Sequence, residues 1–494
     1  MRISRINWNV IGRISAYAIS IILILFVFIS NRPLFLDSLN LALNVVEGTF
    51  SDLSKPLKYQ QSAPILFLYI TKFFTLIFGS SEYTFRLLPL ISGLACLGFF
   101  GSILNRFVQS KYAIIGIFWL GTHSIFIRYS TEFKQYITDA FVCAFLIWMA
   151  LRIKTLNKRN VLFIGLVGAV SIWMSMPSIF VLLGLLFYYS LLQLKSQNSQ
   201  YPILLLATWF LINFILEYYL ILSPAIESDH MQNFHSNYFL QGKIWNLESI
   251  QHDFGLIEST LRIVVGKSTI AITTAMILII LSTYEFIKTK NSFGLLLVVP
   301  ILAVFGASAL GKYSLIERLM IFTVPLIMIL ILRGIQYVAF LLKTKSKWLK
   351  YMVFSIILLA FTVGIVQTQG LKYFITPLEI EDNKSALIHI AQHKENTKTI
   401  VCSQFAYPAY SYYKSYDINY TKLKLGNAIA AKHDESLVQL AYNQCYINKD
   451  DIWILMGHMI EEEITNLILE LEKVGTIKNS YRTKCSAAIL FSTQ

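Results

Sequence analysis

Charged residues are scarce in this chain of 494 residues. They make up 14% of it, while 55% of the residues are hydrophobic, and a typical soluble domain carries roughly 25% charged residues. This composition excludes an ordinary soluble protein and predicts a polytopic membrane protein. The shortage of charge ends near Gln369, because residues 370–494 carry 13 Lys and Arg against 14 Asp and Glu. We therefore expect two domains, residues 1–369 and 370–494.

Cysteine is also rare. Two of the five cysteines, Cys96 and Cys143, lie in apolar segments, and the other three, Cys402, Cys445 and Cys485, could form at most one disulfide. Neither these residues nor the histidines show a metal-ligand spacing. The net charge of +14 lies mostly in short loops between apolar segments, where membrane topology explains it, so no nucleic-acid partner is implied.

Eleven apolar runs come close to the roughly 20 residues that span a bilayer. The first lacks a small-residue cleavage site before Asn31, so we expect it to be retained rather than removed as a signal peptide. A further run, 64–78, is shorter and places Thr71, Lys72 and Thr75 in one sector of a helix, which predicts a juxtamembrane helix lying in the interface. The eleven predicted spans are 12–30, 85–105, 112–128, 136–151, 161–177, 178–194, 202–221, 268–287, 293–311, 316–340 and 350–368.

The distribution of basic residues predicts the orientation. With the N-terminus inside and 64–78 not crossing, the cytoplasmic segments contain 16 Lys and Arg and one acid, Glu285, as the positive-inside rule requires. Counting spans from the N-terminus in this orientation places five further segments outside: the loop 31–63, the junction 128–139, the loop 223–267, the turn 312–318 and the C-terminal domain. We expect any chemistry to occur on that face.

Residues 370–494 read as a small α/β domain. We expect helices at 384–393 and 460–474, strands at 399–405 and 451–456, and a closing hairpin from 477–482 and 486–491. Neither an internal repeat nor a catalytic motif is evident there.

The junction 127–139 places four charges between two apolar segments, namely Arg128, Glu132, Lys134 and Asp139. Lipid makes unpaired charge costly, so these side chains are expected to face water or one another. Two further charges are predicted on the same membrane face. They are Asp37, just beyond the first span, and Arg318.

Such a set suits a phosphate-bearing lipid substrate, with cations holding the phosphate oxygens and a carboxylate acting as base. Two structural alternatives stay open. Asp37 is a favourable N-cap for a helix from Leu39 onward, and the charges as a group are also compatible with a salt-bridge network between span ends.

Several segments resemble the bacterial glycosyltransferase family 39 group, which is related to the protein O-mannosyltransferases and the lipid A aminoarabinose transferases. They are LDSLNLALN (36–44), YQQSAP (59–64), FGSSEYTFRL (78–87), the block 128–139 and KYSLIERLMIFTVP (312–325). The resemblance covers the first 150 residues well, residues 312–335 moderately and the remainder poorly. It implies the membrane-embedded C-type glycosyltransferase fold and inverting transfer from a polyprenyl-phosphate sugar.

The resemblance also implies residue roles. Asp37 corresponds to the family's base and Asp139 to the acid that opens the fourth span. Ser38 stands where relatives often have glutamate. Ala63 stands where aminoarabinose transferases have a phosphate-binding lysine, so Lys58, Lys134, Arg128 or Arg318 would have to replace it.

The sequence therefore predicts a bacterial cytoplasmic-membrane glycosyltransferase of about eleven transmembrane helices and a juxtamembrane helix, with a small α/β soluble domain outside. The expected catalytic residues are Asp37, Glu132 and Asp139, and the expected substrate-binding residues are Lys58, Arg128, Lys134, Tyr136 and Arg318.

The expected partners are a polyprenyl-phosphate-linked sugar, membrane lipids, and an acceptor that is a lipid, a glycan or a protein. Two or three cations can balance the single charge of the carrier phosphate, so we expect no obligatory metal, although a divalent ion is compatible. The alternatives are a transporter or flippase of lipid-linked glycans and a non-catalytic glycan-binding relative. A transporter of this kind is expected to show two related halves with broken helices, which the sequence lacks.

Overall fold

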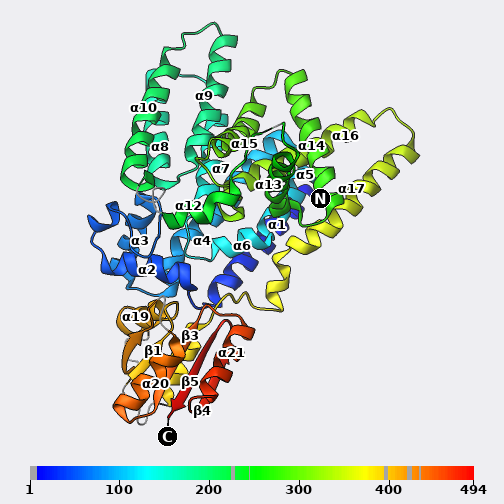
Figure 1. Cartoon of the computed structure of the whole chain (residues 1–494). Helices are drawn as coiled ribbons and strands as arrows, with labels where there is room; N and C mark the ends of the chain where they lie inside the picture. The colour runs from blue at the N-terminus through cyan, green and yellow to red at the C-terminus, as the bar shows by residue number, and fades with distance from the viewer. Residues whose placement is uncertain are drawn as a thin grey trace, which may run out of the picture. The chain divides into compact units, whose positions relative to one another are not determined.

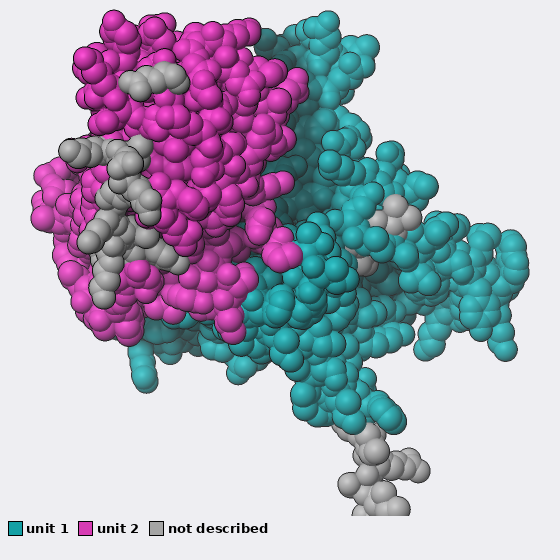
Figure 2. Space-filling model, turned by 90° about the horizontal axis from the view of Figure 1, so that it is seen from below, with its two compact units in different colours: residues 1–27, 62–67, 88–376 teal, residues 28–61, 68–87, 377–494 magenta. Residues whose placement is uncertain are grey.

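The computed structural model describes residues 8–223, 229–243, 245–393, 399–419, 425–432 and 436–493 (Figure 1). It divides into two compact units, coloured in Figure 2. Unit 1 contains residues 1–27, 62–67 and 88–376, and unit 2 contains residues 28–61, 68–87 and 377–494. The C-terminal residues thus share a compact unit with most of the first predicted outer loop.

A helix, or two helices in succession, occupies each of the eleven predicted spans. Seven helical segments of the described residues are long and apolar enough to cross a membrane. The prediction of a mostly helical chain with a small sheet domain is confirmed, and the number of eleven crossings stays a prediction. The elements are α1 (Trp8–Ile29), α4 (Glu82–Phe107), α5 (Ser110–Gly121), α6 (Ser124–Ser130), α7 (Tyr136–Arg152), α8 (Lys158–Met174), α9 (Ser178–Lys195), α10 (Tyr201–Glu217), the π-helix η2 (Tyr218–Leu222), α14 (Thr269–Lys288), α15 (Phe293–Ala309), the 3-10 helix η4 (Glu317–Thr323), α16 (Val324–Leu341) and α17 (Lys347–Thr368).

The predicted span 112–128 is two helices rather than one. Helix α5 ends at Gly121 and α6 begins at Ser124. Between them His123 forms an isolated antiparallel bridge with Gln369, and the carbonyl oxygen of Thr122 accepts a hydrogen bond of 2.7 Å from the Gly370 amide. These backbone bonds to the segment after α17 replace the helical bonds that a continuous helix would make.

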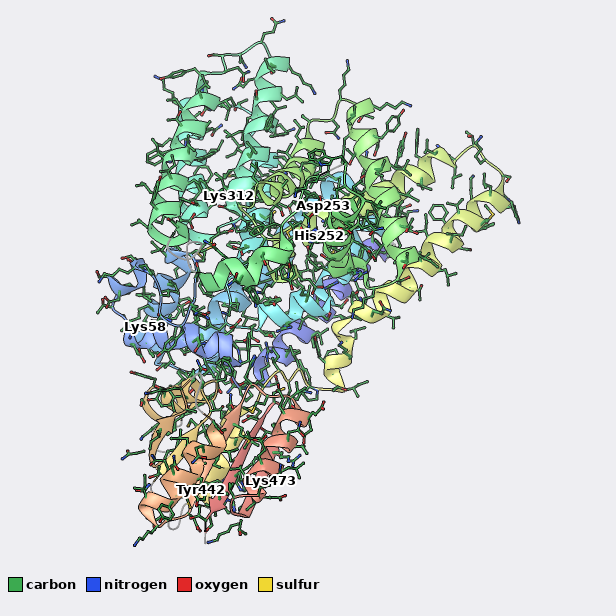
Figure 3. All side chains as sticks on the ribbon, in the orientation of Figure 1. Lys58, His252, Asp253, Lys312, Tyr442 and Lys473 are labelled. Atoms are coloured by element: carbon green, nitrogen blue, oxygen red, sulfur yellow. The ribbon has the colours of Figure 1, made fainter. Side chains whose placement is uncertain are left out.

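The loop between η2 and α14 is largely helical. Its described elements are α12 (Asp229–His235), η3 (Ser236–Tyr238) and α13 (Leu247–Val265). Asp253 of α13 closes the preceding turn by accepting hydrogen bonds from the Gln241 and Gly242 amides at 2.7 and 2.9 Å, and its neighbour His252 lies 3.3 Å from the same carboxylate (Figure 3). His252 is accordingly a structural residue.

The run 64–78 forms the helix α3 (Ile65–Phe78). Its Lys72 ammonium donates hydrogen bonds to the carbonyl oxygens of Val45 and Val46 at 2.8 and 3.4 Å, at the end of α2 (Leu36–Glu47). The polar sector of α3 therefore caps another helix, because the last carbonyl groups of a helix lack intrahelical partners. Four large apolar side chains of α3 stay exposed, namely Phe73, Leu76, Ile77 and Phe78.

The C-terminal part of unit 2 is built on a five-stranded sheet of order β2-β1-β3-β5-β4. Strands β1 (Thr399–Cys402), β2 (Asn427–Ala430) and β3 (Ile452–Gly457) are parallel, and β4 (Thr476–Thr483) and β5 (Ser486–Ser492) form an antiparallel hairpin beside β3. The predicted strands and hairpin are confirmed, as are the helices α18 (Asn383–Gln392) and α21 (Glu461–Glu472). Strand β2 and the helices α19 (Tyr407–Ser415) and α20 (Leu437–Asn448) were not predicted.

All six residues of the central strand β3 are buried. One apolar core lies between the sheet and helices α20 and α21, and it includes Val401, Ile454 and Ile489 from the strands with Leu440 and Ile468 from the helices. Helix α18 packs on β3, β4 and β5. All five cysteines are free thiols.

Candidate functional site

The predicted charged block lies where α6 ends and α7 begins, in unit 1. A close approach between helices positions it, because a Cβ atom at Gly93 of α4 would overlap the Ser130 side chain at the end of α6. The Ser92 hydroxyl lies 3.1 Å from the hydroxyl of Thr138 in the first turn of α7. Small residues of α4 thus place both ends of the turn.

The turn between the two helices is buried although it carries charge. Glu132 is 1% exposed and Lys134 is 6% exposed. The turn is held by the Phe133 ring, stacked on Phe67 with 5.7 Å between centroids, and by the Gln135 amide, which donates to the Ser62 carbonyl oxygen at 3.2 Å. Burial of both charges requires compensation by other polar groups.

Aromatic rings flank this turn. The Tyr129 and Tyr136 rings meet edge to face with 5.2 Å between centroids, and the Arg128 guanidinium carbon lies 5.3 Å from the centre of the Tyr129 ring. A guanidinium over an aromatic face is a cation–π contact that restricts the orientation of the cation. Arg128 and Tyr136, both predicted to bind substrate, therefore both contact the Tyr129 ring.

Asp139 lies one turn into α7 and is 6% exposed. The Ser175 hydroxyl lies beside it, and Glu217 at the end of α10 and Tyr313 lie within electrostatic range. Neither the Asp139 Oδ1 atom nor either carboxylate oxygen of Glu217 has a hydrogen-bond partner among the described residues. Two buried acids in one region are costly unless another group compensates them.

Glu217 was not predicted. It is fully buried and immediately precedes the π-helix η2, and short π-helical turns often occur at functional sites. A signal was present in the sequence, since an acid near the end of an otherwise apolar span is by default a functional-site hypothesis.

Arg318 lies in η4, which packs against α7. Its guanidinium carbon is 5.5 Å from the centre of the Phe234 ring, and its positive charge acts on His235. The preceding turn is fixed by Tyr313, whose hydroxyl donates to the Leu319 carbonyl oxygen at 2.9 Å and whose ring packs edge-on against Phe180. The fold of unit 1 therefore brings the segment of residues 313–323 alongside the helix that carries Asp139.

Asp37 belongs to unit 2. Helix α2 begins at Leu36, with Phe35 as the N-cap residue and no side-chain cap. Asp37 is half-buried and lies inside the first turn, so the alternative that it caps a helix from Leu39 onward is wrong. An acid in the first turn interacts favourably with the helix dipole, and the Leu36 amide donates to the Glu381 carboxylate at 3.2 Å.

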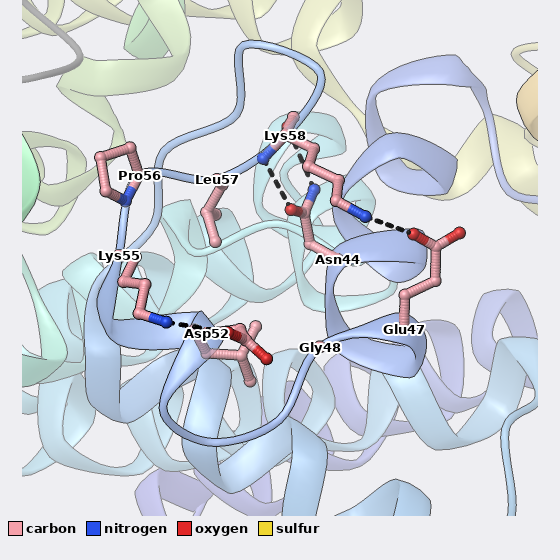
Figure 4. A pocket seen from close by; sticks show the side chains of 9 residues that line it. Asn44, Glu47, Gly48, Asp52, Lys55, Pro56, Leu57 and Lys58 are labelled. Atoms are coloured by element: carbon pink, nitrogen blue, oxygen red, sulfur yellow. Dashed lines mark hydrogen bonds and ion pairs between the residues drawn. The ribbon is translucent and has the colours of Figure 1, made fainter.

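Lys58, also in unit 2, lies on a pocket of about 220 Å³ that residues 44–58 line (Figure 4). Its ammonium is 3.0 Å from the Glu47 carboxylate, which raises the pKa of Lys58. Asn44 accepts from the Lys58 amide at 2.8 Å and donates to its carbonyl oxygen at 3.1 Å. A phosphate bound by Lys58 would share the ammonium with Glu47.

Of the predicted residues, unit 1 contains Arg128, Glu132, Lys134, Tyr136, Asp139 and Arg318, while unit 2 contains Asp37 and Lys58. Within unit 1 the block 128–139 and the segment 313–323 are brought together. From the sequence we also expect Asp37, Glu132, Lys134, Asp139 and Arg318 to line one outward-facing cavity, and this stays a prediction. In the described part of the chain, no group of three or more His, Cys, Asp or Glu side chains is placed to hold a metal ion.

Comparison with known proteins bears on this arrangement. Residues 62–219 match the family model of the dolichyl-phosphate-mannose-protein mannosyltransferases. ArnT from Cupriavidus metallidurans bound to undecaprenyl phosphate is similar in structure, with a TM-score of 0.52, 11% identity and 97% of each chain covered. The chain has the fold of the membrane-embedded C-type glycosyltransferases. The resemblance drawn from the sequence is thereby confirmed.

A second solved structure has a similar fold. The Archaeoglobus fulgidus oligosaccharyltransferase in its apo form gives a TM-score of 0.51 at 10% identity, covering 99% of this chain and 75% of the oligosaccharyltransferase. No curated protein matches the chain by sequence. The family match spans α3 to α10 and therefore includes the block 128–139 and Glu217.

Proposed function

We propose that this protein is an inverting glycosyltransferase that uses a polyprenyl-phosphate sugar and transfers the sugar to an acceptor hydroxyl at the outer face of a bacterial cytoplasmic membrane. The observation that carries the proposal is the buried charged turn 128–139 beside the segment 313–323, in a fold shared with an ArnT structure that binds undecaprenyl phosphate. The half-buried guanidinium groups of Arg128 and Arg318 beside aromatic rings, together with the buried Lys134, suit a lipid phosphate.

In the proposed reaction Asp37 accepts the proton of the acceptor hydroxyl. That oxygen forms a bond to the anomeric carbon while the bond from this carbon to the phosphate oxygen breaks, which inverts the configuration. Arg128, Lys134 and Arg318 stabilise the charge of the departing polyprenyl phosphate, with Lys58 and Tyr136 as further contacts. Glu132, Asp139 and Glu217 orient the cations or accept hydrogen bonds from sugar hydroxyls.

The deciding experiment incubates the purified protein with a panel of radiolabelled polyprenyl-phosphate sugars and membrane extracts. We expect a labelled product whose anomeric configuration is opposite to that of the donor. The expected acceptor is a lipid, a glycan or a protein, and fractionation of the product distinguishes these. Movement of intact labelled donor across reconstituted vesicles without any product would instead indicate a flippase.

The outward orientation is part of the proposal, because it places the acceptor on the outer face. It rests on the excess of basic residues in the predicted cytoplasmic loops. A reporter that is active only in the cytoplasm, fused after Gln494, should be silent. Reporter activity would overturn the orientation.

A further inference from the structure

The carboxyl ends of the parallel strands in unit 2 carry a histidine that the proposed reaction does not use. His458 directly follows β3, and its backbone φ of 60° is in the region that favours glycine. Non-glycine residues held in that region often occur at functional sites. In open α/β sheets this edge is where ligands bind. His458 packs edge-on against the Phe405 ring, with 5.8 Å between centroids, and its side chain is 53% exposed.

Glu381 connects His458 to the helix that carries Asp37. The same carboxylate oxygen of Glu381 lies 3.3 Å from the His458 Nδ1 atom and accepts the hydrogen bond from the Leu36 amide. Glu381 is 3% exposed, and its other oxygen accepts a hydrogen bond from the Asn383 amide. This bond to Leu36 satisfies one of the amides that a helix N-terminus leaves without an intrahelical partner. Glu381 is thus shared between the start of α2 and the imidazole.

The bond between Leu36 and Glu381 brings two negative charges together, and His458 lies where it can balance them. Asp37 directly follows Leu36, so two carboxylates, those of Asp37 and Glu381, lie at the start of one helix. Like charges so placed repel one another unless a cation balances them. Three groups act electrostatically on the imidazole: Glu381 in the segment before α18, Asp37 of α2 and Glu463 of α21. Glu381 raises the pKa of His458, burial opposes the rise, and Asp37 and Glu463 add to it.

We propose that His458 is a positioning residue of the transferase site: it balances the charge of Glu381, so that Glu381 fixes the first turn of α2 and the Asp37 carboxylate stays correctly oriented. The inference rests on the proposed function for its catalytic consequence, but the coupling between His458 and Asp37 is independent of any activity. The C-terminal domain thereby contributes to catalysis without touching the reacting atoms.

The first test needs no activity. The full-length protein is labelled with isotopically enriched histidine and titrated by NMR, and the His458 signal is assigned by its loss in His458→Asn. Replacing Asp37 by Asn removes a negative charge near the imidazole, so the His458 titration midpoint should fall. His393, an exposed histidine at the end of α18 whose Nδ1 atom bonds the carbonyl oxygen of His389 in that helix, serves as the reference and is not expected to respond. An unchanged midpoint for His458 would overturn the proposal.

The second test uses a rescue that a purely structural role would not produce. Asparagine tolerates the left-handed backbone and removes the charge, so His458→Asn should lower kcat about tenfold with little change in the KM for the donor. Glu381→Gln keeps an acceptor for the Leu36 amide and removes the unbalanced charge. Adding it to His458→Asn should therefore restore most of kcat.

One control variant and the wild-type protein separate the possible outcomes. His393→Asn, a matched substitution at an exposed site of the same domain, should leave kcat unchanged. If His458→Asn retains wild-type kcat, or if the double variant is no better than the single one, His458 does not position Asp37. If the wild-type protein transfers no sugar at all, the proposed function fails, and the NMR titration still decides whether His458 and Asp37 are coupled.

Discussion

Glu82 and Lys384, which are 302 residues apart in the chain, form a buried ion pair with 2.9 Å between the ammonium and a carboxylate oxygen. Glu82 is completely buried and also accepts hydrogen bonds from the Tyr413 hydroxyl at 3.0 Å and the Asn31 amide at 3.2 Å. The Tyr413 hydroxyl in turn accepts from the Leu34 amide at 3.2 Å. Within unit 2, one carboxylate therefore links the start of α4, the chain before α2 and the helices α18 and α19.

Removing the cation of this pair should destabilise the protein strongly. Lys384→Met leaves the buried Glu82 carboxylate without its positive partner, and breaking a buried pair in this way costs about 3–5 kcal/mol. The matched control is Lys478→Met, since Lys478 and Asp451 form a largely exposed pair whose loss should cost about 1 kcal/mol or less. Thermal unfolding of the two purified variants measures the difference, and equal losses would contradict a stabilising role for Glu82 and Lys384.

The C-terminal domain should also show a pH-dependent stability from one acid. Burial raises the pKa of Asp417 from 3.8 to about 6, although the Asn419 amide and the Tyr412 hydroxyl donate to it. Between these two pH values the unfolded chain has lost the proton and the folded chain has kept it, so stability falls as pH rises through this window. The difference in stability between Asp417→Asn and the wild type should therefore shift in favour of the variant between pH 4 and pH 7.

Asp451 provides a control of opposite sign. Burial opposes the shift, but Lys478 and Ser492 lower the pKa of Asp451. Its ionised form is favoured in the folded state, so Asp451→Asn should lose stability at pH 7 and lose little at low pH. Unfolding midpoints measured at several pH values for both variants give the two slopes. If the stability of Asp417→Asn depends on pH in the same way as that of the wild type, the Asp417 carboxyl group is not the cause of the fall in stability with rising pH.

The contiguous parts of the site were predictable from sequence, and the long-range parts were not. Four charged residues stand within twelve positions between two apolar runs, namely Arg128, Glu132, Lys134 and Asp139. Because unpaired charge in lipid is costly, this position alone marked them as candidates for a functional site. The β4–β5 hairpin followed from strand periodicity. By contrast, the bond from Leu36 to Glu381 joins residues 345 apart, and no local pattern indicates such a contact.

The prediction of secondary structure also failed where the pattern of apolar residues was weak. Strand β2 has four residues at the sheet edge, none of them fully buried, so it shows no alternation of buried and exposed positions. Helix α19 is rich in tyrosine and begins with a proline at its second position, and it carries little of the apolar period of a surface helix. Both elements depend on tertiary packing.

Glu217 should be more important for activity than for stability. Its side chain is fully buried without a hydrogen-bond partner among the described residues, so Glu217→Gln replaces a group that is costly to ionise there at nearly constant volume and should leave the unfolding temperature unchanged or higher. If Glu217 orients the sugar, turnover should fall at least tenfold. Glu258→Gln, at an exposed pair with Arg262 on α13, is the control. Full activity of Glu217→Gln would remove it from the site.

Arg318 should contribute to holding the lipid phosphate before reaction as well as during it. Arg318→Ala loses a charge-assisted contact in the ground state too, so both donor binding and turnover should weaken. Lys312→Ala removes an exposed cation from the same turn and should change neither. Equilibrium binding of polyprenyl phosphate to the purified variants, together with transfer rates, separates the two effects. Unchanged lipid-phosphate affinity in Arg318→Ala would contradict the assignment.

Asp37→Asn is the sharpest test of the chemistry. The substitution keeps the shape of the side chain and removes its ability to accept a proton, so turnover should fall by roughly 10² to 10⁴. Donor affinity should change little, because cations hold the phosphate. The interaction of the charge with the α2 dipole is worth only about 0.3–1 kcal/mol, so the protein should remain folded, which thermal unfolding checks. Wild-type turnover in Asp37→Asn would end the claim that this carboxylate is the base.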